Sequence, residues 1–305
     1  MKKHGTYDKN YEDLSFTDDF LFCKILEKNH DLTKEILELI LNIKISKLTA
    51  VVSQRSLKFT PFDHGVRLDV FVEDTNQVRY DIEMQTTDEP EIGKRSRYYH
   101  SMIDLDSIES GTKYSDLKKS YVIFICKNTP SAFKVNLPVY TFHSKCDEDE
   151  KVDLKDEQTT VVLNASGPRE GLRPELDHFL DYLSENVVAD PLSTRLEAEV
   201  ESARSSAVWR TEYMTFKMKL DEAFQSGHDE GVEEGIEIGR DQGIEIGENR
   251  GIEKGIDQER TRVILQLLHS GMTSEEIAAR TDYTLEEIDK LKEEAEAEAG
   301  VGSLS

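Results

Sequence analysis

Two short segments in the first third of the chain alternate between apolar and polar residues with a period of two. The even positions of VRLDVFVED (residues 66–74) are Val66, Leu68, Val70 and Val72, and those of VRYDIEMQ (residues 78–85) are Val78, Tyr80, Ile82 and Met84. A period of two predicts β-strands that each bury their even face. The three residues between them, Thr75-Asn76-Gln77, fit a hairpin loop, with Asn76 as the residue that tolerates a positive φ.

The match between the two apolar faces fixes the register of this hairpin. A slip of one residue would turn every side chain to the other face, so Val70 is expected opposite Ile82. The same register places Asp69 opposite Glu83 on the polar face, with about 5 Å between their Cβ atoms. Like charges directly opposite each other destabilise a strand pair, so a positive group should lie between these two carboxylates.

Helical spacing of apolar residues predicts the elements around the hairpin. One helix is expected over residues 17–28, with Thr17 as its N-cap, and a second over residues 32–43. Residues 45–60 are β-like. The stretch EIGKRSRYYHSMIDLDS, residues 91–107, predicts a further helix after the hairpin.

The next segments predict more strands and then a helical remainder. KSYVIFICK, residues 119–127, is a continuous apolar run of the kind that central strands show. Residues 138–145 and 159–165 are also β-like, and the sequence from residue 171 onward is rich in helical patterns. Helices alternating with strands in this order predict an α/β core.

The acidic residues of the hairpin are the candidates for chemistry. The carboxylates of Asp69 and Glu83 and the backbone carbonyl of Met84 offer the oxygen ligands that Mg²⁺ prefers. Such an ion can polarise a phosphodiester and activate water. Gln85 points to the same face as Glu83 and can orient the attacking water, although it lacks the positive charge of a lysine. The alternative is a solvated strand face with alternating charges.

Several short stretches together resemble the Rpn-type recombination-promoting nucleases, which are transposase-like members of the PD-(D/E)XK nuclease superfamily. In order, these stretches are TDDFLFCK, RLDVFVED, YDIEMQ, RSRYYH, GTKY and YVIFIC, and they cover roughly residues 14–130. The resemblance implies a restriction-endonuclease-like fold, in which a central mixed sheet is flanked by helices and a helical extension follows. It also implies that Asp69 and Glu83 bind a metal and that Gln85 stands at the position of the signature lysine.

The resemblance further implies roles for residues on two helices. Asp19 matches an acidic residue of the first helix near the site, and Arg97 with Tyr98-Tyr99 matches an RxYY-like stretch after the site. The residues alone leave alternatives open. Asp19 can equally be an acid favoured by a helix N-terminus. Arg97 is either a phosphate clamp, the positive partner of the carboxylates, or a solvated arginine, and the two tyrosines suit packing.

The function implied is a Mg²⁺-dependent DNA endonuclease that promotes recombination or transposon-like rearrangement. One alternative is a nuclease fold that binds DNA or regulates without cleavage, and another is a nuclease toxin or defence protein. The net charge of −24 restricts where DNA can bind. Residues 1–145 carry 21 Lys and Arg against 22 Asp and Glu, whereas residues 146–305 carry 17 against 40. The second part should repel nucleic acid, which argues against DNA binding there but not against DNA binding in the first part.

A glycine occurs at every fourth position from Gly227 to Gly255, eight in all. Glycine costs about 1 kcal/mol relative to alanine inside a helix, so a helix here needs compensation from packing. Small residues every fourth position let two helix backbones approach closely, and this long spacing favours right-handed winding with a partner. A helix that joins protomers into a homo-oligomer is therefore expected. The alternative is a flexible acidic linker.

The end of the chain, residues 261–296, predicts a helix-turn-helix-like unit of three helices. Gly271 suits the end of the first helix, Thr273 or Ser274 the start of the second, and Thr284 the start of the third. Such units bind DNA, but the acidic last helix favours packing against protein.

The sequence thus divides into a nuclease-like core (1–145), a β/α extension of it (146–190), a helical region with the glycine repeat (191–260), the three-helix unit (261–296) and a disordered tail (297–305).

The remaining features bear on the surroundings of the protein. Cys23, Cys126 and Cys146 form neither a disulfide framework nor a zinc motif, so they are expected as buried small residues in a reducing cytoplasm. The sequence contains no run of about 18 apolar residues, so no membrane span is expected. The N-terminal residues also lack the apolar core of a signal peptide.

Overall fold

The computed structural model describes residues 9–58, 65–108, 113–149 and 151–301. It divides into two compact units, Met1–Lys219 and Leu220–Ser305. The first unit contains a six-stranded sheet, and the second contains the whole glycine repeat and the three-helix unit. Each unit is described separately.

The sheet of the first unit is mixed, as the α/β expectation requires. Its strand order is β1-β2-β3-β4-β6-β5, with β3, β4 and β6 parallel and the other neighbours antiparallel. The strands are β1 (Leu48–Leu57), β2 (Val66–Asp74), β3 (Arg79–Gln85), β4 (Ser120–Cys126), β5 (Val139–Phe142) and β6 (Gln158–Asn164). The apolar run of β4 lies in the sheet centre, where every one of its residues is buried.

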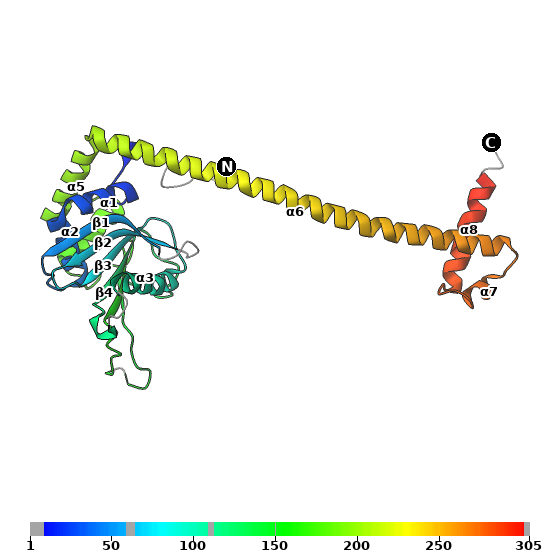
Figure 1. Cartoon of the computed structure of the whole chain (residues 1–305), viewed down its shortest axis with the longest axis horizontal. Helices are drawn as coiled ribbons and strands as arrows, with labels where there is room; N and C mark the ends of the chain where they lie inside the picture. Colours follow the sequence, from blue (N-terminus) through cyan, green and yellow to red (C-terminus); the bar gives the residue numbers. More distant parts are fainter. Residues whose placement is uncertain (1–8, 59–64, 109–112, 150, 302–305) are drawn as a thin grey trace. The chain divides into compact units, whose positions relative to one another are not determined.

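Helices cover both faces of this sheet (Figure 1). Residues of α1 (Asp19–Lys28), α2 (His30–Leu41), α4 (Pro174–Glu185) and α5 (Pro191–Arg204) share one apolar core with β2 and β3. The helix α3 (Ile92–Ser107) forms a second core on the opposite face. Both faces of the sheet are therefore buried. Helix α1 begins at Asp19, and its N-cap is Asp18 rather than the predicted Thr17.

The hairpin has the predicted register. Val70 pairs with Ile82, and Val72 with Tyr80. The residue with positive φ in the loop is Gln77, at 61°, and not Asn76. Asn76 instead donates its backbone N–H to the side chain of Asp74, 2.8 Å away, and this bond holds the turn.

The even residues of β2 do not all face the same side, in contrast to the expectation from strict alternation. Val70 and Val72 pack in the core formed with α1 and α2, whereas Val66 and Leu68 pack in the core formed with α3. The change of face falls at Asp69. Gln54, the β1 residue opposite Asp69, has a left-handed backbone with φ of 51°, which marks a local distortion of the strand pair. Residue 69 therefore lies where the strand bends.

The helical region that follows is broken once. Residues Ser205 and Ser206 separate α5 from α6 (Ala207–His269), so the helical region expected over residues 191–260 is interrupted there. Helix α6 then runs through all eight glycines without a break, which contradicts the flexible-linker alternative. No helix in the described part of the chain is long and apolar enough to cross a membrane.

The end of the chain forms the expected three-helix unit. The last turns of α6 pack with α7 (Ser274–Ala278) and α8 (Leu285–Val301) around Ile264, Ile277 and Ile288, which are all buried. Gly271 has φ of 93°, and Thr273 caps α7. The helix α8 continues to Val301, so most of the expected disordered tail is helical, and residues 302–305 lie outside the described residues.

Candidate active site

Asp69 and Glu83 meet where β2 separates from β3. The strand ladder ends at Val70–Ile82, and the two acids are connected beyond it by reciprocal hydrogen bonds. The backbone N–H of Asp69 donates to Oε1 of Glu83 over 3.0 Å, and the backbone N–H of Met84 donates to Oδ2 of Asp69 over 3.1 Å. Each carboxylate is thus held by the backbone of the opposite strand.

The backbone of Met84 faces the same gap. The N–H and C=O groups of one residue in a strand point to the same side. Because the Met84 N–H bonds Asp69, its carbonyl is also directed toward the space between β2 and β3. The three oxygen donors expected for a metal therefore surround one gap in the sheet.

Asp19 adds a third acid from the first turn of α1. The ligand atoms of Asp19, Cys23 and Asp69 all lie within 4.8 Å of one another. The thiol of Cys23 donates to Oδ1 of Asp19 and to the backbone carbonyl of Asp69, each over 3.4 Å. Cys23 and Cys126 are buried as expected, whereas Cys146 is only partly buried. Cys23 therefore both fills the core and connects the first helix to the bend in β2.

Arg95 is the positive group that the paired carboxylates require. Its guanidinium donates to Oε2 of Glu83 over 3.1 Å and to Oε1 of Gln85 over 2.9 Å. It also donates to the hydroxyl of Tyr99, one helical turn further on, over 3.0 Å. Arg97 was a candidate for this role, but its side chain is exposed on another side of α3, because two residues correspond to about 200° of rotation.

The neighbouring tyrosines divide as packing predicts. Tyr99 is buried against Phe124, and Tyr98 is 38% exposed at the rim.

Asp81 places one more acid beside Glu83, two residues earlier on β3. It is fully buried, and neither carboxylate oxygen has a hydrogen-bond partner among the described residues. Burial and the charges of Glu83 and Asp69 raise the pKa of Asp81 well above its usual range. A protonated Asp81 can share its proton with Glu83, which avoids two adjacent buried charges.

The acids of the gap carry more negative charge than the protein neutralises. Burial, with the charges of Glu83 and Asp19, raises the pKa of Asp69 to about 8. Burial raises the pKa of Glu83 to about 7, although the Asp69 N–H and Arg95 oppose the shift. Oxygen donors with surplus negative charge fit a hard divalent cation such as Mg²⁺.

These pKa values predict how stability depends on pH in the absence of metal. The folded-state pKa values, about 8 for Asp69 and about 7 for Glu83, exceed those of unfolded carboxyls. Their stabilisation is therefore fully present below about pH 4 and is lost as the pH rises through 7 to 8. In EDTA, the Tm should fall by at least about 3 °C between pH 6 and pH 8.5, and Mg²⁺ should restore it at pH 8.5.

The variant Asp69→Asn serves as the comparison in these melting experiments. It lacks the titrating group, so its Tm should depend less on pH than that of the wild type. Equal slopes for the two proteins would contradict the proposed coupling.

Arg67 is a second cation close enough to act on Asp69. It is exposed on β2, and its charge lowers the pKa of Asp69. Its guanidinium lies 5.9 Å from the ring centroid of Phe216, in the first part of α6. Arg67 is thus placed to contact an anion that approaches Asp69.

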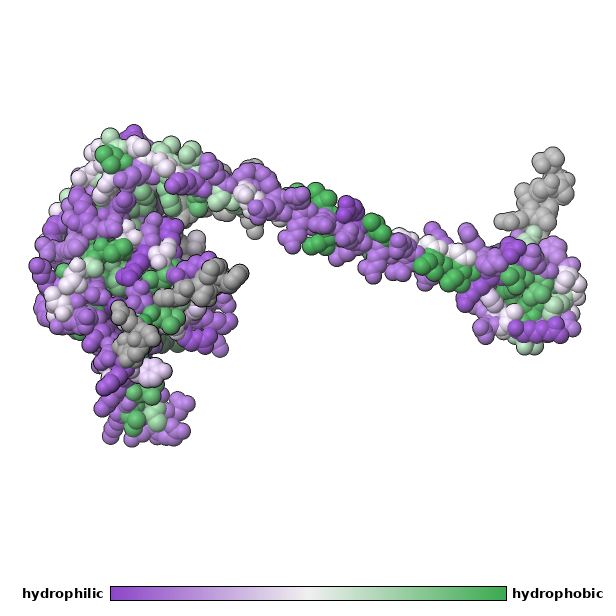
Figure 2. All heavy atoms as spheres, viewed as in Figure 1, coloured by the Kyte–Doolittle hydropathy of each residue, from purple (hydrophilic) through white to green (hydrophobic). Residues whose placement is uncertain are grey.

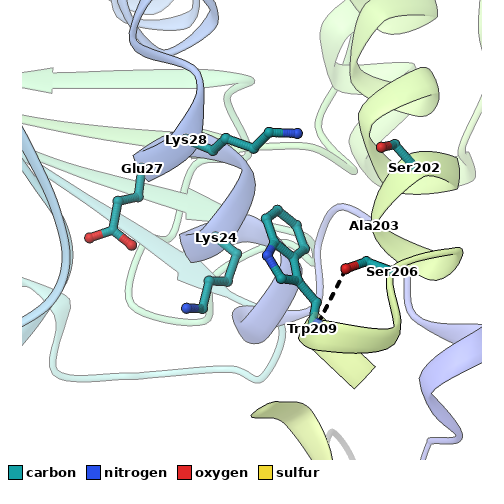
Figure 3. A pocket seen from close by; sticks show the side chains of 7 residues that line it. All are labelled: Lys24, Glu27, Lys28, Ser202, Ala203, Ser206 and Trp209. Atoms are coloured by element: carbon teal, nitrogen blue, oxygen red, sulfur yellow. Dashed lines mark hydrogen bonds between the residues drawn. The ribbon is translucent and has the colours of Figure 1, made fainter. Parts of the chain in front are cut away.

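A hollow elsewhere in the first unit is unsuited to the same chemistry (Figure 3). It has a volume of about 360 Å³ and lies between α1 and the helices α5 and α6. Lys24 lines it and forms an ion pair with Glu212, and the Lys28 ammonium lies 5.6 Å from the Trp209 ring centroid. Two lysines on its wall do not form a cation site, so the gap beside Asp69 remains the candidate.

Sequence reasoning missed Arg95, Arg67, Cys23 and Asp81. A signal for Arg95 was present, since Arg95 and Tyr99 are spaced by four residues and must lie on one side of a helix. Cys23 and Arg67 become visible only when α1 and the bend in β2 are placed, and Asp81 only when α3 is placed.

The bent hairpin with its acids, set in a mixed sheet between helices, defines the class of restriction-endonuclease-like α/β proteins. A family model of the PD-(D/E)XK nuclease family transposases matches residues 16–166. The nuclease-like core of the chain therefore belongs to this family, and its general function is that of a nuclease or transposase. No curated protein and no solved structure matches the chain.

Proposed function

We propose that the protein is a divalent-metal-dependent DNA endonuclease that hydrolyses phosphodiester bonds and promotes recombination or transposon-like rearrangement. The observation that carries this proposal is the reciprocal bonding of Asp69 and Glu83, which holds two carboxylates of raised pKa at one gap. Family membership of residues 16–166 supports DNA as the substrate.

The oxygens of Asp69 and Glu83 and the carbonyl of Met84 would hold the cation. When bound there, Mg²⁺ would supply Lewis-acid polarisation of the phosphodiester and lower the pKa of water. Arg95 supports this arrangement by fixing Glu83 and Gln85 through two hydrogen bonds. A rigid second layer of this kind keeps ligands oriented.

The other side chains of the gap suit the attack of water on a phosphodiester. Oε1 of Gln85 accepts from Arg95, so its amide N–H groups remain to donate to the water or to a phosphate oxygen. Gln85 cannot accept the proton of that water. Asp19, next to Asp69, is placed to accept it. Arg67, in place of Arg97, is the arginine positioned to contact the phosphate.

We also propose that the chain self-associates through the glycine-rich part of α6 and works in the cytoplasm. The eight glycines lie on a continuous helix, and beyond the neighbouring backbone of that helix an added Cβ at each would meet no atom of the described residues within 4 Å. Packing within the chain therefore does not require them. The free cysteines fit a reducing compartment.

A second function is favoured by one observation. Gln85 replaces the signature lysine, and its carbonyl oxygen accepts a hydrogen bond from Arg95, so residue 85 brings no positive charge of its own to the attacking water. A nuclease fold that binds DNA without cutting it is therefore the competing proposal. A toxin or defence nuclease, the remaining alternative, would cleave by the same chemistry as the proposed endonuclease.

Plasmid nicking separates the enzyme from the binder. The purified protein should convert supercoiled plasmid to the open-circular form with Mg²⁺, and EDTA should stop the reaction. Retention of plasmid in a binding assay without any conversion would support the non-cleaving alternative.

A further inference from the structure

Four rows of side chains run along the glycine-rich part of α6, because the sequence there repeats every four residues. The glycine row consists of Gly227 and every fourth residue to Gly255. The preceding row and the following row are the residues directly before and after each glycine, about 100° to either side. The acidic row, two residues after each glycine, lies about 200° away and is acidic at seven of its eight positions from residue 229 to residue 257.

Apolar side chains beside the glycines are exposed. They are Val232, Ile236, Ile238, Ile244, Ile246, Ile252 and Ile256, which are between 47% and 66% exposed. Figure 2 shows green patches of this kind along the otherwise purple surface of α6. All of these residues belong to the preceding or the following row, so within each repeat they flank the glycine and the acidic row lies on the opposite side. This arrangement is typical of a helix face that packs against a partner.

The charges of the preceding row are separated by sign along the helix. Glu230 and Glu234 stand near its start, and Arg250 and Lys254 near its end. Like charges four residues apart destabilise a lone helix. A partner that runs in the opposite direction would place the acidic end beside the basic end.

We infer that two copies of α6 pair antiparallel, with a two-fold axis passing beside Gln242, Gly243 and Ile244. This pairing rests on the proposed self-association and specifies its partner, direction and register. In an antiparallel pair, each flanking row lies opposite the same row of the second copy in reverse order.

This axis generates six complementary pairs. In the preceding row Glu230 faces Lys254, Glu234 faces Arg250, and Ile238 faces Ile246. In the following row Val232 faces Ile256, Ile236 faces Ile252, and Arg240 faces Glu248. The glycine rows of the two copies face each other along the centre of the interface, and both acidic rows remain in solvent.

Other arrangements lose this match. Moving the partner by one repeat in one direction pairs Arg240 with Ile244 and Ile236 with Glu248. A move in the other direction pairs Arg240 with Ile252 and Ile244 with Glu248. A parallel pair in register would set the preceding row against the following row, so Glu234 would lie among Val232 and Ile236 of the other copy. The charge pattern therefore selects one direction and one register.

The spacing of four residues also specifies how the copies cross. Each step turns 400°, so the glycine row advances by about 40° per repeat around a straight helix. Two such rows stay in contact along their length only when the two helices wind around each other in the right-handed sense. Arg240 and Glu248 form the ion pair nearest the two-fold axis.

The inferred interface continues into a groove of the same unit. This groove has a volume of about 790 Å³ and is lined by Ile252, Gly255 and Ile256 of α6 and by Tyr283 of the three-helix unit. In the inferred pair, Val232 of the second copy lies opposite Ile256 and covers this groove. The apolar wall of the groove is thereby buried by the same interface.

Charge reversal at the central ion pair tests the pairing in the full-length protein by sedimentation. Arg240→Glu alone and Glu248→Arg alone each create two like-charge contacts per dimer, and each should raise the dimer Kd by at least about tenfold. An equimolar mixture of the two variants should recover a wild-type Kd, because only the mixed dimer has opposite charges at both contacts. Circular dichroism of each variant monitors the helix itself.

Each possible result of this experiment either supports or overturns the inferred pairing. Failure of the mixture to regain affinity, or unchanged affinity of the single variants, would overturn the antiparallel register while leaving self-association in place. A wild-type protein that sediments as a monomer would overturn both self-association and the pairing, whereas the nuclease proposal is judged independently by plasmid nicking. A second experiment uses two variants that both carry Cys146→Ser, one with Ile238→Cys and the other with Ile246→Cys. A disulfide is expected between a chain of one variant and a chain of the other, and its absence would contradict the register.

Discussion

Replacing Asp69 with asparagine should lower the rate of plasmid nicking by at least about 10³-fold, because removal of one carboxylate ligand takes away several kcal/mol of transition-state stabilisation. The fold should persist, since the asparagine carbonyl can still accept the Met84 N–H that Asp69 accepts. Removing a buried acid whose pKa is raised also relieves repulsion from Glu83. The comparison is the initial nicking rate at saturating Mg²⁺.

Glu170→Gln provides the control for this change. Glu170 is exposed in a loop, and its substitution also removes one negative charge. It should leave nicking within about twofold of the wild type, as expected of surface changes away from a site. If Asp69→Asn and Glu170→Gln nick at the same rate, Asp69 has no part in catalysis.

Arg95→Ala should lower both stability and nicking, whereas Arg97→Ala should change neither. Arg95 holds Glu83, Gln85 and Tyr99, and its loss leaves a buried carboxylate without its cation. A cost of about 2–4 kcal/mol is expected for such a break, compared with about 0.5 kcal/mol or less for an exposed arginine. Urea unfolding of both variants measures the difference.

The two arginines are two positions apart on α3, so this pair tests the phase of the helix. The effect of Arg95→Ala should also shrink at low pH, where Glu83 is protonated and needs no partner. Equal losses of stability in the two variants at neutral pH would contradict the placement of Arg95.

The hairpin could be predicted because a period of two leaves little freedom. Val70 had to meet Ile82 if both apolar faces were to be buried, and Asp69 had to approach Glu83 as a consequence. The bend at Asp69 could not be predicted in this way. It depends on the backbone distortion at Gln54 in β1 and on the two apolar cores, each of which buries a different part of β2.

The partners of the acids depended on long-range packing. Which arginine of α3 meets Glu83 is set by the side of the helix that is buried, and this side is defined by Ile92, Tyr99 and Ile103. The position of Asp19 beside Asp69 came from the resemblance alone, since fifty residues separate them in sequence. Asp81 looked like an ordinary polar strand residue until α3 was found to cover it.

The most direct test of the metal-dependent nuclease follows ion binding and DNA cleavage in the same samples. Mn²⁺ is titrated into wild-type and Asp69→Asn protein, with bound ion measured by electron paramagnetic resonance and nicking measured on plasmid. The wild type should bind the ion and nick in proportion to occupancy, and Asp69→Asn should do neither. Equal nicking by the two proteins, or nicking that persists in EDTA, would contradict the assignment of Asp69 and Glu83 as the site of cleavage.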